Sequence, residues 1–202
     1  RVTDHETMEV VNMVLAGKVN KELVTMLNHF GVKAAGISGQ DGGLIIAAKK
    51  KLPGGEDLGF VGEVEHINPE LLHTLLAKGY IPVVATVGVG AEGEIYNINA
   101  DTVAGELAAA LQAEKLIMLT DVEGIFENPA DSSTLISKVK VAKALEMIAD
   151  GRIDSGMIPK VEACIYALRH GVNRTHIIDG RRPHSLLLEV LTDKGIGSMV
   201  VE

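Results

Sequence analysis

Apolar and polar residues alternate along the chain in two recurring patterns. From Asp4 to Phe30 the apolar positions return at helical spacing, so this region is predicted to be helical, with Thr3 or Asp4 as its N-terminal cap and Gly31 as its stop. Beyond Gly31, short apolar runs of strand type alternate with segments of helical spacing. The predicted strands are residues 32–38, 44–50, 60–66, 81–87, 95–98, 115–120, 175–179 and 198–201. The predicted helices after the first region are residues 69–78, 100–111, 141–150, 157–170 and 184–191.

This alternation predicts an α/β protein, arranged as a three-layer αβα sandwich around a largely parallel central sheet. A soft boundary falls at residues 112–114, where a second set of strand–helix units begins. We therefore expect two lobes, residues 1–112 and 113–202. A chain of 202 residues is long enough to give such lobes an ample core.

Composition narrows the class of partner. Hydrophobic residues make up 47% of the chain and aromatic residues 3%, which is typical of buried parallel strands and their covering helices. The net charge of −8 argues against nucleic-acid and anionic-membrane partners, because both reward a basic surface. Neither a run of about 20 apolar residues nor a signal peptide occurs, so we expect a cytoplasmic protein, or a plastid one if the source is a plant or alga.

Cysteine and histidine give little sign of chemistry. Cys164 is the single cysteine and lies at an apolar position of a predicted helix, which favours a buried structural thiol over a reactive one. The seven histidines show no metal-binding spacing, so no metal site is predicted, and they are interpreted as surface or packing residues with His184 as a possible exception. Serine-elbow and Cys–His nucleophile motifs do not occur in the sequence.

Two glycine-rich loops follow predicted strands. GVGAEG, residues 88–93, matches the spacing of a dinucleotide fingerprint, but a strand and not a helix follows it, and Glu92 would repel phosphates. We interpret it as a hairpin-like turn that delivers Asn97 and Asn99. SGQDGG, residues 38–43, is either a simple turn or a place where the backbone approaches a ligand closely.

Three further features suggest a binding site. Lys160 lies in the first turns of a predicted helix, where a cation is unfavourable unless an anion such as phosphate is also attracted; a solvated surface lysine is the alternative. Asp121 leaves the carboxyl end of a parallel strand, the edge at which α/β proteins bind ligands, although it could simply cap a turn. Asn97, Asn99 and Asp101 crowd one strand-to-helix corner, where capping explains only one of the three.

The motifs, taken in order, resemble the N-acetylglutamate kinases of the amino-acid-kinase fold family. They are RVTD, AGKVNKELV, SGQDGG, VGEV, IPVVATVGVG, YNINAD, AEKLIMLTDVEG, SGMIPKVEAC, HIIDGR and HSLLLEVLTDKGIGS. The resemblance runs through all 202 residues and implies the amino-acid-kinase fold. It implies phosphoryl transfer from ATP, accompanied by Mg²⁺, to the side-chain carboxylate of N-acetyl-L-glutamate in arginine biosynthesis. A carboxylate with a pKa near ~4.3 is already ionised at neutral pH, so no general base is required.

The resemblance also assigns roles to individual residues. Residues 1–112 would be the later part of a substrate-binding and dimerisation lobe, and residues 113–202 a nucleotide-binding lobe. Lys160 would neutralise phosphate charge and Asp101 would orient catalytic lysines, while the substrate would be bound by Arg1, Asn97 and Asn99. The implied nucleotide-binding residues are Thr120, Asp121, Val122, Gly124, Met157 and Ile158.

Regulation and assembly are implied in the same way. The C-terminal segment is similar to that of arginine-inhibited members, with His184, Glu189 and Gly197 as candidate ligands of L-arginine. The first helices match the region through which these enzymes form homodimers, and an additional N-terminal helix would permit a higher oligomer. Ser198 and Gln40 differ from the usual threonine and lysine of the family.

The family's first strand, its catalytic lysine and a glycine-rich loop would precede Arg1, so we expect the 202-residue chain alone to be inactive. Two alternatives remain at this stage. One is a non-catalytic module that binds nucleotide or arginine, and the other is a kinase of the same fold that acts on glutamate, aspartate or carbamate.

Overall fold

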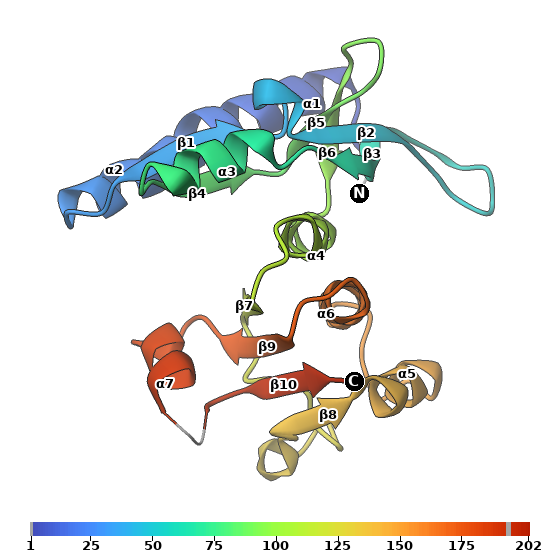
Figure 1. Cartoon of the computed structure of the whole chain (residues 1–202). Coiled ribbons are helices and arrows are strands. Elements are labelled where there is room, and N and C mark those ends of the chain that lie inside the picture. Colours follow the sequence, from blue (N-terminus) through green and yellow to red (C-terminus); the bar gives the residue numbers. More distant parts are fainter. Residues whose placement is uncertain (1, 193–194) are drawn as a thin grey trace. The chain divides into compact units, whose positions relative to one another are not determined.

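The computed structural model describes residues 2–192 and 195–202, and the chain forms two compact units, residues 1–103 and 104–202. The helices are α1 (His5–Asn12), α2 (Asn20–His29), α3 (Glu70–Ala77), α4 (Ala100–Ala110), α5 (Val141–Ala149), α6 (Ile158–Arg169) and α7 (Ser185–Leu191) (Figure 1). The strands are β1 (Ala34–Ser38), β2 (Ile45–Lys51), β3 (Asp57–Ile67), β4 (Ile81–Ala85), β5 (Val87–Val89), β6 (Ile95–Ile98), β7 (Lys115–Thr120), β8 (Lys138–Lys140), β9 (Arg174–Asp179) and β10 (Ser198–Val201). A π-helical segment, Met13–Val19, joins α1 to α2, and 3₁₀ turns occupy Asp41–Gly43 and Ser132–Thr134.

The first unit contains two strand assemblies. Strands β1 and β4 pair in parallel, with α2 packed on both and α3 packed on β4 (Figure 1). Strands β2, β3, β6 and β5 close into a small barrel. The sequence predicted one strand over residues 81–87, but the chain changes partners after Ala85, so that β4 pairs with β1 while β5 pairs with β2 and β6.

A buried asparagine fixes the first helical layer to its strands. Asn20 of α2 is 3% exposed, and its Nδ2 donates to the carbonyl oxygens of Val83 at 2.8 Å and Ile37 at 3.2 Å. These two bonds satisfy a buried amide and tie α2 to both β1 and β4. Gly36 is required beneath it, because a Cβ there would lie 2.0 Å from Asn20 Oδ1.

The second unit is a three-layer arrangement around a four-stranded sheet of order β7-β9-β10-β8. Neighbours β7 and β9 are parallel, as are β10 and β8, whereas β10 is antiparallel to β9. Successive strand residues face opposite sides. Ile177 of β9 accordingly packs in the core with α5 and α6, while His176 faces α7 through Glu189.

The predicted α/β fold class is confirmed, and most predicted elements agree with the structure. Cys164 is fully buried in the core, as the interpretation as a structural thiol requires. The sequence did not predict β8, the π-helical segment or the two 3₁₀ turns. The functional boundary predicted between residues 112 and 113 stays a prediction; the compact units divide within α4, between Val103 and Ala104.

Candidate active site

The strand-to-helix corner at residues 97–101 is capped by one of its three polar residues. Asn99 Oδ1 accepts hydrogen bonds from the backbone N–H of Thr102 at 3.0 Å and from its hydroxyl at 3.3 Å, so Asn99 is the cap of α4. Asp101 lies half-buried in the first turn of α4, where the helix dipole favours a carboxylate. Asn97 is half-buried on β6, and its Nδ2 lies 3.5 Å from Thr3 Oγ1.

Thr3 docks the beginning of the chain next to this corner. Its N–H donates to Leu58 O at 2.9 Å, and its carbonyl accepts from Phe60 N at 2.7 Å. Between them, Gly59 adopts φ +70°, and a Cβ there would lie 2.2 Å from Thr3 O. Because β3 pairs with β6, this docking brings Thr3 beside Asn97. The other substrate candidate, Arg1, lies outside the described residues.

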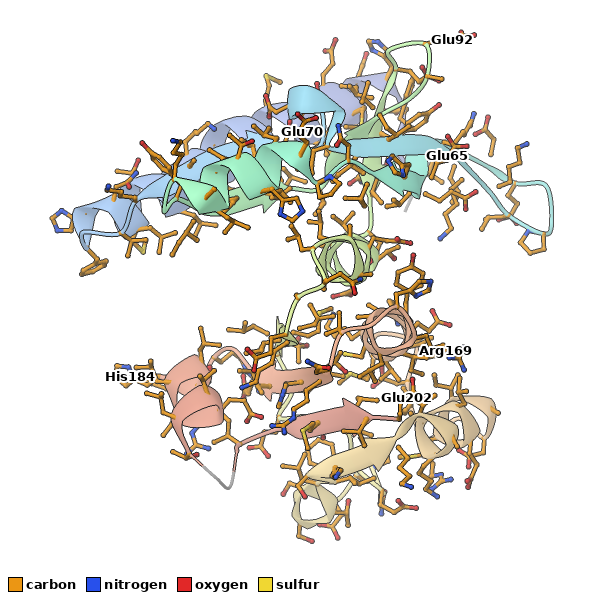
Figure 2. All side chains as sticks on the ribbon, in the orientation of Figure 1. Glu65, Glu70, Glu92, Arg169, His184 and Glu202 are labelled. Atoms are coloured by element: carbon orange, nitrogen blue, oxygen red, sulfur yellow. The ribbon has the colours of Figure 1, made fainter. Side chains whose placement is uncertain are left out.

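The two glycine-rich loops are structural turns in this fold. In SGQDGG, Asp41 Oδ2 accepts from the N–H of Ser38 at 2.6 Å and from its hydroxyl at 3.0 Å, which closes the turn on itself. GVGAEG forms the end of β5 and a hairpin to β6, with Glu92 at its tip (Figure 2). Gly88 is needed for packing, since a Cβ there would lie 2.6 Å from Ile98 Cδ1. The interpretation as a hairpin turn is confirmed.

A polar cavity of about 270 Å³ brings together most of the predicted nucleotide-binding residues of the second unit. It is lined by Thr120, Asp121, Val122, Asp154, Gly156, Met157 and Lys160. Thr120 and Asp121 come from the carboxyl end of β7, and Lys160 comes from the first turn of α6. A helix N-terminus attracts anions, so a lysine beside it creates a region suited to a phosphate-like group.

An apolar cavity of about 120 Å³ adjoins the polar one and shares Val122, Asp154 and Met157 with it. Its lining is Val122, Gly124, Ile125, Phe126, Pro129, Arg152, Ile153, Asp154 and Met157. Apolar side chains with a few polar groups at one end are typical of sites for ring-bearing small molecules. Ile158 is the one nucleotide candidate that lines neither cavity, because its side chain packs against the core.

Sequence analysis missed Asp154 and Arg152. Asp154 Oδ1 accepts from the N–H groups of Gly156 at 2.8 Å and Met157 at 2.9 Å, which starts α6 and shapes the cavity floor. Asp154 precedes Gly156 by two residues and Met157 by three. This spacing is a helix-capping signal that the sequence already contains. Arg152 carries no such local signal. Its hydrogen bonds lower the pKa of the Asp150 carboxyl below the ordinary value.

Two of the three effector candidates lie at the start of α7 and within it, and the third, Gly197, directly precedes β10. His184 precedes α7 with φ +60° and is exposed at the outer side of the helix (Figure 2). Glu189 is buried, with a side chain 7% exposed, and accepts from His176 Nδ1 at 2.6 Å and Ile196 N at 2.7 Å. Gly197 packs so closely that a Cβ would lie 2.2 Å from Ile177 O. Glu189 therefore already ties α7 to β9 and to the turn before β10.

A half-buried contact links α4 to α6 within the second unit. Tyr166 donates its hydroxyl to Glu106 Oε2 at 2.6 Å and stacks on the His170 ring at a centroid distance of 4.0 Å. Burial, followed by this hydrogen bond to a carboxylate, raises the pKa of Tyr166 to about 12. The contact fixes the helix that carries Lys160 against α4.

The described residues show neither a metal-binding cluster nor a membrane-spanning helix. Among residues 2–192 and 195–202, His, Cys, Asp and Glu side chains do not form a group of three or more that could hold a metal ion. Over the same described ranges, every helix is too short or too polar to span a bilayer.

Comparison with known proteins gives consistent similarities over the whole chain. The model of the Amino acid kinase family matches residues 1–179. An acetylglutamate kinase from Moorella thermoacetica is 59% identical over 208 residues, which cover 100% of this chain and 70% of that protein. Another from Heliobacterium modesticaldum is 58% identical over 210 residues, with 100% and 71% covered. The structure of N-acetylglutamate synthase from Neisseria gonorrhoeae, complexed with coenzyme A and N-acetyl-glutamate, superposes with a TM-score of 0.88 at 26% identity, covering 100% of this chain and 45% of that one.

Proposed function

Because this chain belongs to the amino acid kinase family, we propose that it transfers the γ-phosphoryl group of ATP to the side-chain carboxylate of N-acetyl-L-glutamate, in arginine biosynthesis. The observation that carries the proposal is the identity of 58–59% to acetylglutamate kinases along the entire chain. The family implies a phosphotransferase that uses ATP. The products would be ADP and N-acetyl-L-glutamyl 5-phosphate.

We propose that catalysis rests on positioning and on charge neutralisation. The acceptor carboxylate is ionised at neutral pH and needs no base, so the obstacle is the approach of one anion to another. Lys160 and the N-terminus of α6 would stabilise phosphate oxygens in the polar cavity. The apolar cavity beside it would take the base, with Val122, Gly124 and Met157 in its wall.

The acceptor end of the site is proposed for the corner at residues 97–101. Asn97 and Asn99 would hold N-acetylglutamate, with Arg1 as a bidentate partner of its α-carboxylate. The Oδ1 atom of Asn99 accepts the capping hydrogen bond of α4. Its Nδ2 group would therefore be the donor to a substrate carbonyl or carboxylate. Asp101 would orient lysine side chains.

Magnesium is proposed to accompany ATP. Mg²⁺ retains several waters and is commonly held by one or two carboxylates together with substrate phosphates, so a dedicated cage of protein ligands is unnecessary. Asp121 in the wall of the polar cavity fits this role. When bound, the ion would neutralise charge on the phosphates.

Self-association and feedback regulation complete the proposal. The first helices expose a row of large apolar side chains, which is typical of a protein–protein interface and supports a homodimer. They are Val10, Met13, Leu23, Met26 and Phe30, exposed by 46–77%. We propose L-arginine as an inhibitor that binds at the α7 segment, where the unused lone pairs of Glu189 would attract its guanidinium. A cytoplasmic location, or a plastid one in a plant or alga, is proposed with them.

Trapping of the acyl phosphate with hydroxylamine tests the reaction. With a chain that also carries the N-terminal segment the family resemblance implies, N-acetyl-L-glutamate should give a hydroxamate in the presence of Mg-ATP, whereas L-glutamate, L-aspartate and carbamate should not. The Lys160→Ala variant should lose affinity for Mg-ADP by calorimetry, while Lys78→Ala, at an exposed position of the first unit, should not. Preference for another acceptor would reassign the substrate, and unchanged ADP binding by Lys160→Ala would remove Lys160 from the site.

A further inference from the structure

The apolar cavity of the second unit has walls from two separate loops. The 121–137 loop between β7 and β8 contributes Phe126 and Pro129, and the 150–157 loop between α5 and α6 contributes Arg152 and Ile153. Glu127 directly follows Phe126 in the first loop. The Arg152 guanidinium donates from Nη1 to the Glu127 carboxylate, so an ion pair joins the two loops, and Lys143 of α5 lies 3.7 Å from the same carboxylate oxygen.

Arg152 is held by two carboxylates on its own side of the cavity, in addition to Glu127. Its Nε donates to Asp150 Oδ2 at 2.9 Å, and its Nη2 donates to the same atom at 2.5 Å and to Glu146 Oε1 at 2.8 Å. The Arg152 side chain is 24% exposed, less than any of these partners. A planar guanidinium held at several points loses little further freedom when it binds one more carboxylate.

Hydrogen bonds within the 121–137 loop hold the backbone at Glu127. Its N–H donates to Thr134 O at 3.0 Å, and the Thr134 hydroxyl accepts from Asn128 N at 3.1 Å. Phe126 forms a bridge with Leu135 on the returning side of the same loop. The two sides of this loop are therefore joined near Glu127, next to the cavity residue Phe126.

We propose that Arg152 is a positioning residue that acts through Glu127 to hold the two cavity walls at the separation that fits the base of the nucleotide. The inference rests on the proposed function, in which the base of ATP occupies the apolar cavity. Arg152 lines that cavity and not the polar one that contains Thr120 and Lys160, and Glu127 directly follows Phe126 in its wall. Loss of the pair should therefore weaken binding of the base and leave phosphate binding and the chemical step unchanged.

Calorimetry on wild type, Glu127→Gln, Arg152→Gln and the double variant tests this role. Affinity for Mg-ADP should fall about two- to fivefold in each single variant, the range for a partly exposed ion pair, and no further in the double variant. Affinity for magnesium tripolyphosphate, which has no base, should be unchanged. In a chain that also carries the N-terminal segment the family resemblance implies, KM for ATP should rise while kcat stays constant. Lys49→Gln, which breaks the Lys49–Asp57 pair in the first unit, is the matched control and should change neither ligand.

Each outcome separates the inference from the proposed function. If wild type binds Mg-ADP and both single variants bind it equally well, the positioning role is wrong and the nucleotide site stands. If Arg152→Gln alone loses tripolyphosphate, Arg152 contacts phosphate directly and does not act through Glu127. If wild type binds no nucleotide at all, the site and the inference fall together. Glu127 is 51% exposed, so Glu127→Gln should fold normally, and circular dichroism checks this.

Discussion

Replacement of Ser198 by alanine should loosen the loop that forms one wall of the apolar cavity. Ser198 is fully buried on β10, and its Oγ accepts from Ile125 N at 2.8 Å and donates to Ile136 O at 2.7 Å. Ile125 and Ile136 lie at the two bases of the 121–137 loop, so a single hydroxyl fastens both to the sheet. Gly124 packs against the same hydroxyl, since a Cβ there would lie 2.5 Å from Ser198 Oγ.

The expected loss follows from these contacts. Ser198→Ala removes the bond to Ile136 O, worth about 1 kcal/mol, and leaves the Ile125 N–H without its acceptor in the core, which costs about 1–3 kcal/mol with the lost bond included. We expect the free energy of unfolding of the second unit to fall by about 2–4 kcal/mol, with little contribution from the small cavity left by one oxygen.

Urea denaturation followed by far-UV circular dichroism measures this change, and Mg-ADP calorimetry should show weaker binding in the folded variant. Ser137→Ala is a matched control, because Ser137 lies in the same loop but is exposed. It should alter stability by less than about 0.5 kcal/mol. A loss below about 1 kcal/mol in Ser198→Ala would mean that the hydroxyl does not fasten the loop.

Three other predictions concern different parts of the chain. The pKa of Tyr166 is raised from 10.0 to about 12. The stabilisation from its hydrogen bond to Glu106 should therefore be complete below pH 10 and be lost as the pH rises through about 12. Absorbance titration of tyrosinate in wild type and in Tyr166→Phe checks this. Met26→Glu places a charge in the exposed apolar row of α2 and should convert a dimer to monomers in light scattering. Glu189→Gln replaces a charged acceptor of the His176 ring and should lower the free energy of unfolding by about 1–3 kcal/mol in urea denaturation.

The contrary results are equally specific. A Tyr166→Phe titration identical to that of wild type would refute the shifted group. A wild type that is monomeric at every concentration, or a Met26→Glu variant that remains dimeric, would exclude this row as the interface. Unchanged stability of Glu189→Gln would show that the carboxylate charge contributes nothing to the α7 contact.

The sequence by itself determined most of the helices and strands and the capping of two helices. Asp4 caps α1 through Thr7 N at 2.8 Å, and Asn99 caps α4, as the residue types at those positions predict. The strand after GVGAEG was readable from its apolar alternation, which correctly excluded a dinucleotide fingerprint. These features depend on neighbours three or four residues away, so the local sequence contains nearly all the information that specifies them.

The candidate site was only partly accessible from the sequence. Thr120, Asp121 and Lys160 were identified from motifs and share one cavity, but their roles stay predictions. Glu189 was predicted as a candidate ligand of arginine, a role that stays a prediction; the structure shows its carboxylate hydrogen-bonded to His176, a partner that no local pattern indicated.

Tertiary structure alone decided the contacts between distant segments. The sequence pattern of residues 81–89 predicts one strand followed by a turn. Their division into β4 and β5 depends on pairing with different strands, β1 for β4 and β6 for β5. The Arg152–Glu127 pair and the Ser198–Ile125 bond join residues 25 and 73 positions apart. Such pairs form only after packing has closed the intervening chain, because the entropy of closure is offset by the whole core and not by the residues that meet.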